Sequence, residues 1–149
     1  MTVAPARILQ GGRAKAYRPL PDEQRRRAIR AGLAAYRRGD FFEAHELLEP
    51  AWMGTADIAD RDLLQGLIKL AAGYVHAVRG NVTGLEKNLA GAQERLERAD
   101  GATVPGVDRR ALVARIEAHL EALRGREPGD LDRAAILALL PPPTFGGRR

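Results

Sequence analysis

The stretch that decides the fold runs from Gly39 to Trp52 and reads Gly-Asp-Phe-Phe-Glu-Ala-His-Glu-Leu-Leu-Glu-Pro-Ala-Trp. At about 100° per residue, its apolar side chains fall in one continuous arc of a helix. The members of this arc are Phe41, Ala44, Leu47, Leu48, Ala51 and Trp52. Such an arc predicts a helix that packs against a core. Asp40 is a candidate N-cap with Glu43 at capping-box spacing, and Pro50, which lacks an N–H, should kink or end the helix.

Two polar residues, His45 and Glu49, interrupt this apolar face. They fall between Trp52 and Phe42 at the border of the arc, and their spacing places one side chain above the other. A carboxylate in such a position is costly to bury unless it is paired or hydrogen-bonded. We therefore expect His45 and Glu49 to form one coupled pair, with Glu46 at its rim.

The composition excludes several kinds of chemistry. The 149 residues are enough for one domain with a real core. They include no cysteine and no serine, which excludes disulfides, thiolate ligands, cysteine nucleophiles and a Ser-His-Asp triad. The sequence shows no secretory signal and no apolar run long enough to cross a bilayer. We expect a cytoplasmic protein with no membrane partner.

Basic residues are concentrated near the N-terminus. Residues 1–38 contain ten lysines and arginines against two acidic residues, whereas the rest of the chain carries a net charge of −3. Residues 1–20 are rich in Gly, Pro, Arg and Ala without periodicity, which predicts a flexible basic arm that folding does not require. Such an arm could meet phosphate or an acidic partner, so nucleic-acid binding through it is one alternative function.

Helical periodicity extends over residues 21–140 and predicts an all-α fold, a single-domain bundle of about six helices. The helix from about Arg61 to Arg79, preceded by Asp60 as a candidate cap, has the widest apolar arc and should be central. Gly66 and Gly73 leave one side of it smooth, so that another helix can approach closely. Three consecutive prolines then predict that residues 141–149 form an extended Pro-rich tail.

A glycine followed by Asp or Asn precedes three predicted helices, at Gly39, Gly80 and Gly129. The expected N-caps of the later helices are Asn81, Asp108 and Asp130. The unequal spacing of the three glycines does not define a sequence repeat. The recurring glycine followed by Asp or Asn is still compatible with a distant helix-turn-helix repeat-like geometry.

Three segments occur in order along the chain: residues 39–49 with Trp52, then Gln65-Gly66-Leu67-Ile68 with His76, then Gly80-Asn81 with Gly84. Together they resemble a family of small, mostly prokaryotic helical proteins, domain of unknown function family 309. The resemblance covers roughly residues 25–97 and implies an all-helical fold with no established activity. The family's His-Glu-x-x-Glu-x-x-Trp motif falls on His45, Glu46, Glu49 and Trp52. Lys69 departs from the pattern, because a polar uncharged residue is expected there.

The candidate site consists of His45, Glu46, Glu49, Trp52, Gln65 and His76. The wide apolar arc and the smooth glycine side of the central helix favour a binding or scaffold module that holds a peptide or protein partner or forms a homo-oligomer. Alternatively, His45 and Glu49, with His76 as a third ligand, suit a divalent metal such as zinc or iron, as in a metal-dependent hydrolase. The sequence requires no cofactor, and it favours binding over catalysis because it contains no phosphate loop or dinucleotide motif.

Overall fold

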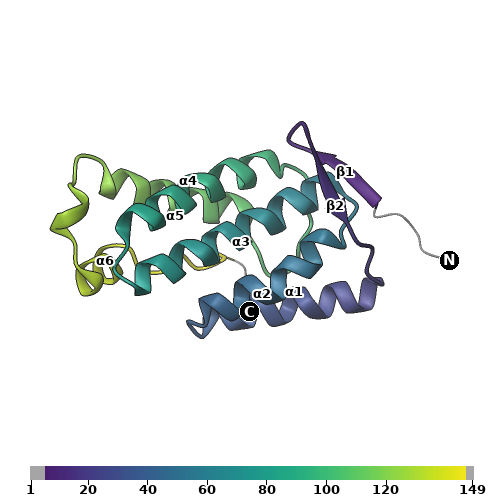
Figure 1. The fold of residues 1–149 in the computed structure, drawn as a ribbon, viewed down its shortest axis with the longest axis horizontal. Helices are drawn as coiled ribbons and strands as arrows, with labels where there is room; N and C mark the ends of the chain where they lie inside the picture. The colour runs from purple at the N-terminus through teal and green to yellow at the C-terminus, as the bar shows by residue number, and fades with distance from the viewer. Residues whose placement is uncertain (1–5, 147–149) are drawn as a thin grey trace.

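The computed structural model describes residues 6–146, so parts of the predicted arm and tail, residues 1–5 and 147–149, lie outside it. Its elements in chain order are β1 (Ala6–Gln10), β2 (Arg13–Tyr17), α1 (Asp22–Arg37), α2 (Phe41–Met53), α3 (Ile58–Val78), α4 (Val82–Arg98), α5 (Arg109–Leu123), the 3-10 turn η1 (Pro128–Asp130) and α6 (Arg133–Leu139). The helices form one body, with the two-stranded hairpin at the end opposite to α6 (Figure 1). The predicted predominantly helical single domain is confirmed.

Helix α3 is central, with α2 and α4 packed along it, α1 packed on α2, and α5 packed on α4. The predicted close approach to the glycine side of α3 is confirmed, because α4 lies there. A Cβ atom on Gly66 would stand 2.8 Å from Leu96 Cγ, and one on Gly73 would stand 3.2 Å from Asn88 Cβ. A larger residue at Gly66 would therefore push α4 away from α3.

Helix α2 presents the predicted face to the core. Its buried residues are Phe41, Ala44, Leu48 and Ala51. Trp52 is only partly buried and packs at the edge of the core. The helix runs three residues beyond Pro50 and ends at Met53. The predicted capping box is not formed, because the Asp40 side chain makes no cap hydrogen bond and Glu43 accepts from Arg38 Nη2 at 2.9 Å instead.

Two helix starts differ from the sequence-based prediction. Helix α3 begins at Ile58 because Asp57 is the cap, with Oδ2 accepting from the Asp60 N–H at 2.9 Å. The Asp60 carboxylate accepts from the Thr103 N–H instead. Helix α6 is capped by Asp132, since Asp130 belongs to the preceding 3-10 turn. The predicted caps that are confirmed are Asn81 and Asp108.

Gly39 and Gly80 end α1 and α3 in the same way. Both adopt positive φ, 84° and 77°, which glycine reaches without steric cost. At each site the next residue donates its N–H to the carbonyl five residues earlier, which defines a Schellman motif. These bonds are Asp40 N–H to Ala35 O and Asn81 N–H to His76 O, both 2.9 Å. Gly129 lies in the 3-10 turn η1, so the third glycine followed by an acidic residue has a different role from Gly39 and Gly80.

The structure corrects the prediction of a flexible arm for residues 6–17, which form a docked hairpin. Strands β1 and β2 pair antiparallel around the two-residue turn Gly11-Gly12, with Gln10 opposite Arg13. Both glycines have positive φ, 59° and 78°, as a type I′ turn requires. Gln10, at the end of β1, is only 1% exposed, so the hairpin is attached to the helices through a buried polar side chain.

The side-chain amide of Gln10 is saturated with hydrogen bonds. Its Nε2 donates to Asp62 Oδ1 and to Gln65 Oε1, both at 2.8 Å. Its Oε1 accepts from Trp52 Nε1 at 3.1 Å and from Arg61 Nε at 3.2 Å. Since an amide has two N–H donors and two acceptor lone pairs, every position is used. One hairpin side chain thereby joins α2 to α3.

Arg61, in the first turn of α3, is fully buried. Its Nη1 donates to the carbonyls of Trp52, Met53 and Thr55 at 3.1, 3.4 and 3.1 Å. Its Nη2 donates to the Ala16 carbonyl of β2 at 3.2 Å, and the guanidinium lies 5.3 Å from the centroid of the Trp52 ring. The carbonyl end of a helix carries partial negative charge, so the C-terminus of α2 stabilises this buried cation.

The chain after α6 is extended, but it packs as a strap across the helices. The hydroxyls of two buried tyrosines donate to it, Tyr74 to Leu140 O at 2.9 Å and Tyr36 to Pro143 O at 2.7 Å. Phe145 is 3% exposed, and its ring centroid lies 4.6 Å from that of Tyr36. Burial raises the pKa of both tyrosines, which keeps the hydroxyls protonated as donors. The strap therefore belongs to the core.

We predict that Arg61 cannot be replaced by lysine. Arg61→Met leaves the carbonyls of Trp52, Thr55 and Ala16 without their donor and should lower the free energy of unfolding by about 3–5 kcal/mol. Arg61→Lys should lose a large part of this, because an ammonium cannot span acceptors arranged around a planar guanidinium. Denaturant unfolding followed by circular dichroism measures both changes.

Arg30→Met is the matched control, since the Arg30 side chain is 65% exposed on α1 and its loss should change stability by no more than about 0.5 kcal/mol. An Arg61→Lys variant as stable as the native protein would contradict the role given to the guanidinium.

Candidate functional site

An open cleft of about 260 Å³ lies between α2, α3 and α4. Its lining residues are His45, Glu49, Trp52, Gln65, Ile68, Lys69, Ala72 and Asn88. Four of the six residues of the predicted candidate site are therefore brought together, His45, Glu49 and Trp52 from α2 and Gln65 from α3. Glu46 lies at the rim, with a side chain that is 58% exposed.

The structure does not show the predicted direct pair between His45 and Glu49. The carboxylate nearest to His45 Nδ1 is that of Glu46, at 3.6 Å. Within residues 6–146 no hydrogen bond or ion pair links His45 to Glu49. Both side chains are partly exposed, so solvent in the cleft can hydrate them and neither needs the other as a partner.

His76 lies outside the cleft, which corrects the proposed three-residue metal site. Gln65 and His76 are eleven residues apart on α3, about 16 Å along the helix axis. The ring of His76 fills the space above Gly84, where a Cβ atom would stand 2.6 Å from His76 Cγ, and its Nδ1 lies 3.2 Å from Asn81 Nδ2. No group of three His, Asp or Glu side chains that could hold a metal ion exists among the described residues, so the ligand set His45, Glu49 and His76 is not formed.

The hairpin holds two of the residues that line the cleft. Gln10 binds the Trp52 indole N–H and the Gln65 amide oxygen at the same time. Gln10, Arg61 and the hairpin were not predicted from the sequence to belong to the candidate site. A pair of glycines between two short apolar-polar runs is a hairpin signal, and Gly11-Gly12 could have revealed this element.

Lys69 is a further residue of the cleft that was not predicted to belong to the candidate site. It is half-buried in the cleft, and within the described chain it forms no ion pair with a carboxylate. Burial, followed by repulsion from Arg95, Lys15 and Lys87, lowers the pKa of Lys69, while Glu94 acts in the opposite direction. A lysine whose surroundings disfavour its own charge is a feature of functional sites.

The cleft thus combines several kinds of group at short range. Glu49 can accept hydrogen bonds, Lys69 can donate them, and Ile68 and Ala72 provide apolar surface. Such a mixture suits a small polar ligand with an apolar part, because a few placed polar groups fix the orientation of a ligand that apolar walls enclose.

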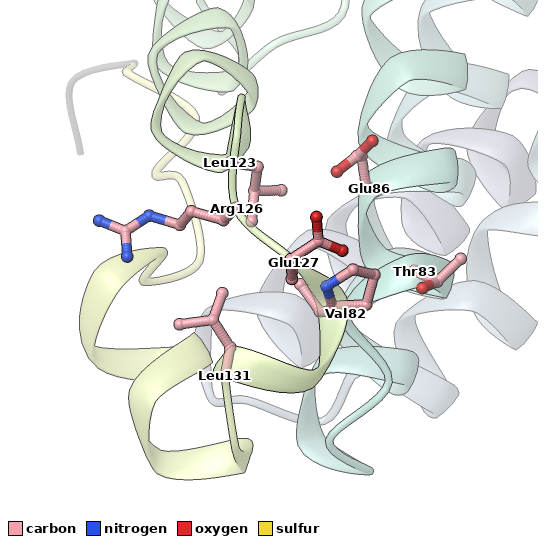
Figure 2. A pocket seen from close by; sticks show the side chains of 8 residues that line it. Val82, Thr83, Glu86, Leu123, Arg126, Glu127 and Leu131 are labelled. Atoms are coloured by element: carbon pink, nitrogen blue, oxygen red, sulfur yellow. The ribbon is translucent and has the colours of Figure 1, made fainter.

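A second, smaller cavity of about 100 Å³ lies at the other end of the helices, near η1 and the starts of α4 and α6. Figure 2 shows its mixed lining, in which the apolar side chains of Val82, Leu123 and Leu131 lie beside polar ones such as Thr83, Glu86 and Glu127. Arg126 points away from it and donates to the Ala122 carbonyl at 2.9 Å. None of the predicted site residues lines this cavity.

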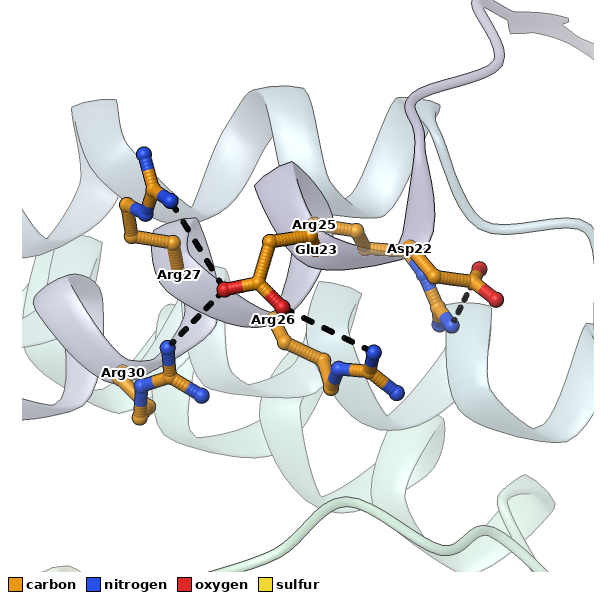
Figure 3. Close-up of polar contacts among 6 residues, drawn as sticks. All are labelled: Asp22, Glu23, Arg25, Arg26, Arg27 and Arg30. Atoms are coloured by element: carbon orange, nitrogen blue, oxygen red, sulfur yellow. Dashed lines mark hydrogen bonds and ion pairs between the residues drawn. The ribbon is translucent and has the colours of Figure 1, made fainter.

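Helix α1 carries an exposed basic surface. Three arginines surround the Glu23 carboxylate at 3.7–3.9 Å, and Arg25 pairs with Asp22 at 3.2 Å (Figure 3). The three are Arg26, Arg27 and Arg30. Surface ion pairs of this kind add little stability, so the patch is a solvated helix face with a net positive charge.

The fold and the site define a single helical domain with a polar cleft between its second, third and fourth helices. Residues 29–88 match the family model described as Domain of unknown function (DUF309), which supports the resemblance seen in the sequence. The matched segment contains α2, α3 and every residue that lines the cleft. Comparison with curated proteins and with solved structures gives no match. Within residues 6–146 no helix is long and apolar enough to span a membrane.

We predict that Lys69 titrates below the ordinary lysine pKa of about 10.4. The three lysines of the chain can be labelled by reductive ¹³C-methylation and followed by NMR during a pH titration, and the Lys69→Arg variant identifies the signal. Because the unfolded chain holds this proton more tightly than the folded chain, the free energy of unfolding should rise with pH between the lowered and the ordinary pKa. A Lys69 signal that titrates at or above 10.4 would contradict the burial and repulsion described.

Proposed function

We propose that this protein is a binding module for a small polar ligand and that the ligand enters the cleft between α2, α3 and α4. The observation that carries this proposal is that His45, Glu49, Trp52 and Gln65, which come from two separate helices, line one open cavity together. The same four residues lie in the motifs that resemble the family, and they fall within the matched segment.

The size of the cleft supports a small ligand. Cavities that enclose drug-sized ligands have volumes of about 300–1,000 Å³. A cleft of about 260 Å³ matches a smaller molecule or a single side chain or terminus of a peptide. Its walls are helices packed on the central α3, and buried hydrogen bonds from the hairpin hold Trp52 and Gln65, so the binding surface is pre-formed.

The charges in the cleft support a polar ligand. Glu49 on α2 and Lys69 on α3 both line it, and within the described residues they do not form an ion pair with each other. Opposite charges that share a cleft without meeting leave room for a ligand that presents a donor to Glu49 and an acceptor to Lys69.

Neutral probes can test the site without knowledge of the natural ligand. We expect acetamide and isopropanol, titrated into ¹⁵N-labelled protein, to shift the backbone signals of the cleft residues and the indole N–H signal of Trp52, the only tryptophan. Ala72→Leu fills the cleft and should remove these shifts.

Ala90→Leu is the matched control, because it makes the same change on the exposed face of α4. Shifts that map to the cavity around Val82 and Leu131, or that persist in Ala72→Leu, would show that the cleft is not the binding site.

A further inference from the structure

The hydrogen bonds around the hairpin determine which end of the Gln65 amide faces the cleft. Trp52 and Arg61 can only donate hydrogen bonds, so the Gln10 group that contacts both must be its oxygen. The Gln10 NH₂ group then faces Asp62 and Gln65. Gln65 must present its oxygen to this NH₂ group, as the 2.8 Å contact between Gln10 Nε2 and Gln65 Oε1 records.

Because the Gln65 oxygen accepts from Gln10, the Gln65 NH₂ group is the end of the amide that remains free to face the cleft. Gln65 lines the cleft, and within residues 6–146 its Nε2 makes no hydrogen bond to the protein. Amide orientation is normally ambiguous, but here it follows from two side chains that have no acceptor atom. Gln65 is therefore a hydrogen-bond donor toward any molecule in the cleft.

Lys69 supplies a second donor next to the first. It follows Gln65 by four residues on α3, so the two side chains lie on the same face of the helix, and both line the cleft. The Lys69 side chain lies over Gly91 of α4, where a Cβ atom would stand 3.1 Å from its Cδ and 3.7 Å from its Nζ. The missing side chain at Gly91 makes room for the ammonium group between α3 and α4.

Further positive charge surrounds this pair of donors. Arg95 lies one turn beyond Gly91 on α4, and the hairpin turn lies against it, since a Cβ atom on Gly11 would stand 3.1 Å from Arg95 Nη1. Neither Arg95 nor Lys15 of β2 pairs with a carboxylate within the described chain, and both are close enough to repel the charge of Lys69. Glu94 of α4 offsets part of this positive charge, but the cations that act on Lys69 outnumber it, and an excess of positive charge attracts an anion.

We propose that Gln65 and Lys69 together bind the oxyanion group, a phosphate or a carboxylate, of the small ligand that occupies the cleft. This inference rests on the proposed function and specifies its ligand class. Lys69 Nζ and Gln65 Nε2 donate to the oxygens of the anion, and Arg95 and Lys15 supply the surrounding positive field. Glu49, on the opposite wall, accepts hydrogen bonds from hydroxyl or amino groups elsewhere in the ligand.

Two substitutions test the donor pair with little effect on the fold. Gln65→Glu keeps an oxygen for Gln10 Nε2 but replaces the NH₂ donor by a second carboxylate oxygen, and Lys69→Met removes the ammonium group with similar side-chain length. Titrations of glycerol 3-phosphate and of glycerate, each against sodium chloride at equal ionic strength, are followed by NMR. We expect binding of one or both probes at the cleft and a loss of affinity of about tenfold or more in either variant.

Gln24→Glu and Arg30→Gln are matched controls for charge, because both residues are exposed on α1, and binding should be retained in them. The two probes distinguish a phosphate ligand from a carboxylate ligand, and a short oligodeoxythymidylate adds the case of nucleic-acid phosphate. Binding of the oligonucleotide that Lys69→Met leaves unchanged, or probe shifts that map to the α1 arginines, would overturn the proposal.

The outcomes also separate this inference from the proposed function. If neither anion binds while acetamide still shifts the cleft signals, the oxyanion assignment is wrong and the binding cleft stands. If acetamide and the anions all leave the cleft signals unchanged, both the cleft function and the assignment are wrong.

Discussion

The buried guanidinium of Arg61 is the constraint on which the rest of the structure depends. A charge in the protein interior is tolerated only when its donors are satisfied, and Arg61 is satisfied by the last carbonyls of α2, the loop at Thr55, the strand carbonyl of Ala16 and the amide oxygen of Gln10. These acceptors come from three separate segments, so the hairpin, the end of α2 and the start of α3 must meet at one point. The indole of Trp52 covers the guanidinium and completes its burial.

The same network determines the shape and the polarity of the cleft. Trp52 and Gln65 line the cleft, and both are hydrogen-bonded to Gln10. Gln10 belongs to residues 1–20, for which the sequence predicted a flexible arm. Because Trp52 and Arg61 are obligate donors, the orientation of each amide in the series follows from theirs. A buried structural charge therefore decides that Gln65 offers a donor rather than an acceptor to a ligand. In this protein, stability and binding chemistry depend on a shared set of hydrogen bonds.

Periodicity predicted what repeats along a helix, and missed what depends on contacts between distant segments. The buried face of α2, the glycine side of α3 and the caps at Asn81 and Asp108 followed from local spacing. The hairpin was missed because five-residue strands give a short periodic signal and because the residue that docks them, Gln10, is polar.

His45 and Glu49 were expected to pair because both lie at the border of an apolar arc, but one helix cannot reveal that the facing helices leave an open cleft there. His76 was expected in the site as a third ligand, yet distance along α3 separates it from Gln65. Phe145 could not be placed in the core, since its partner Tyr36 is more than a hundred residues away in the chain.

The link between the arginine network and the cleft can be tested directly on the only indole of the chain. The Trp52 N–H is bound to Gln10 Oε1 at 3.1 Å, so its exchange with solvent deuterium reports whether the hairpin holds this wall of the cleft. In NMR exchange measurements we predict a protected indole N–H in the native protein. Exchange should be about fivefold or more faster in Gln10→Ala, because one hydrogen bond of typical strength is lost. An indole N–H that exchanges at the same rate in both proteins would show that Gln10 does not hold Trp52, and the link between the buried arginine network and the cleft would be wrong.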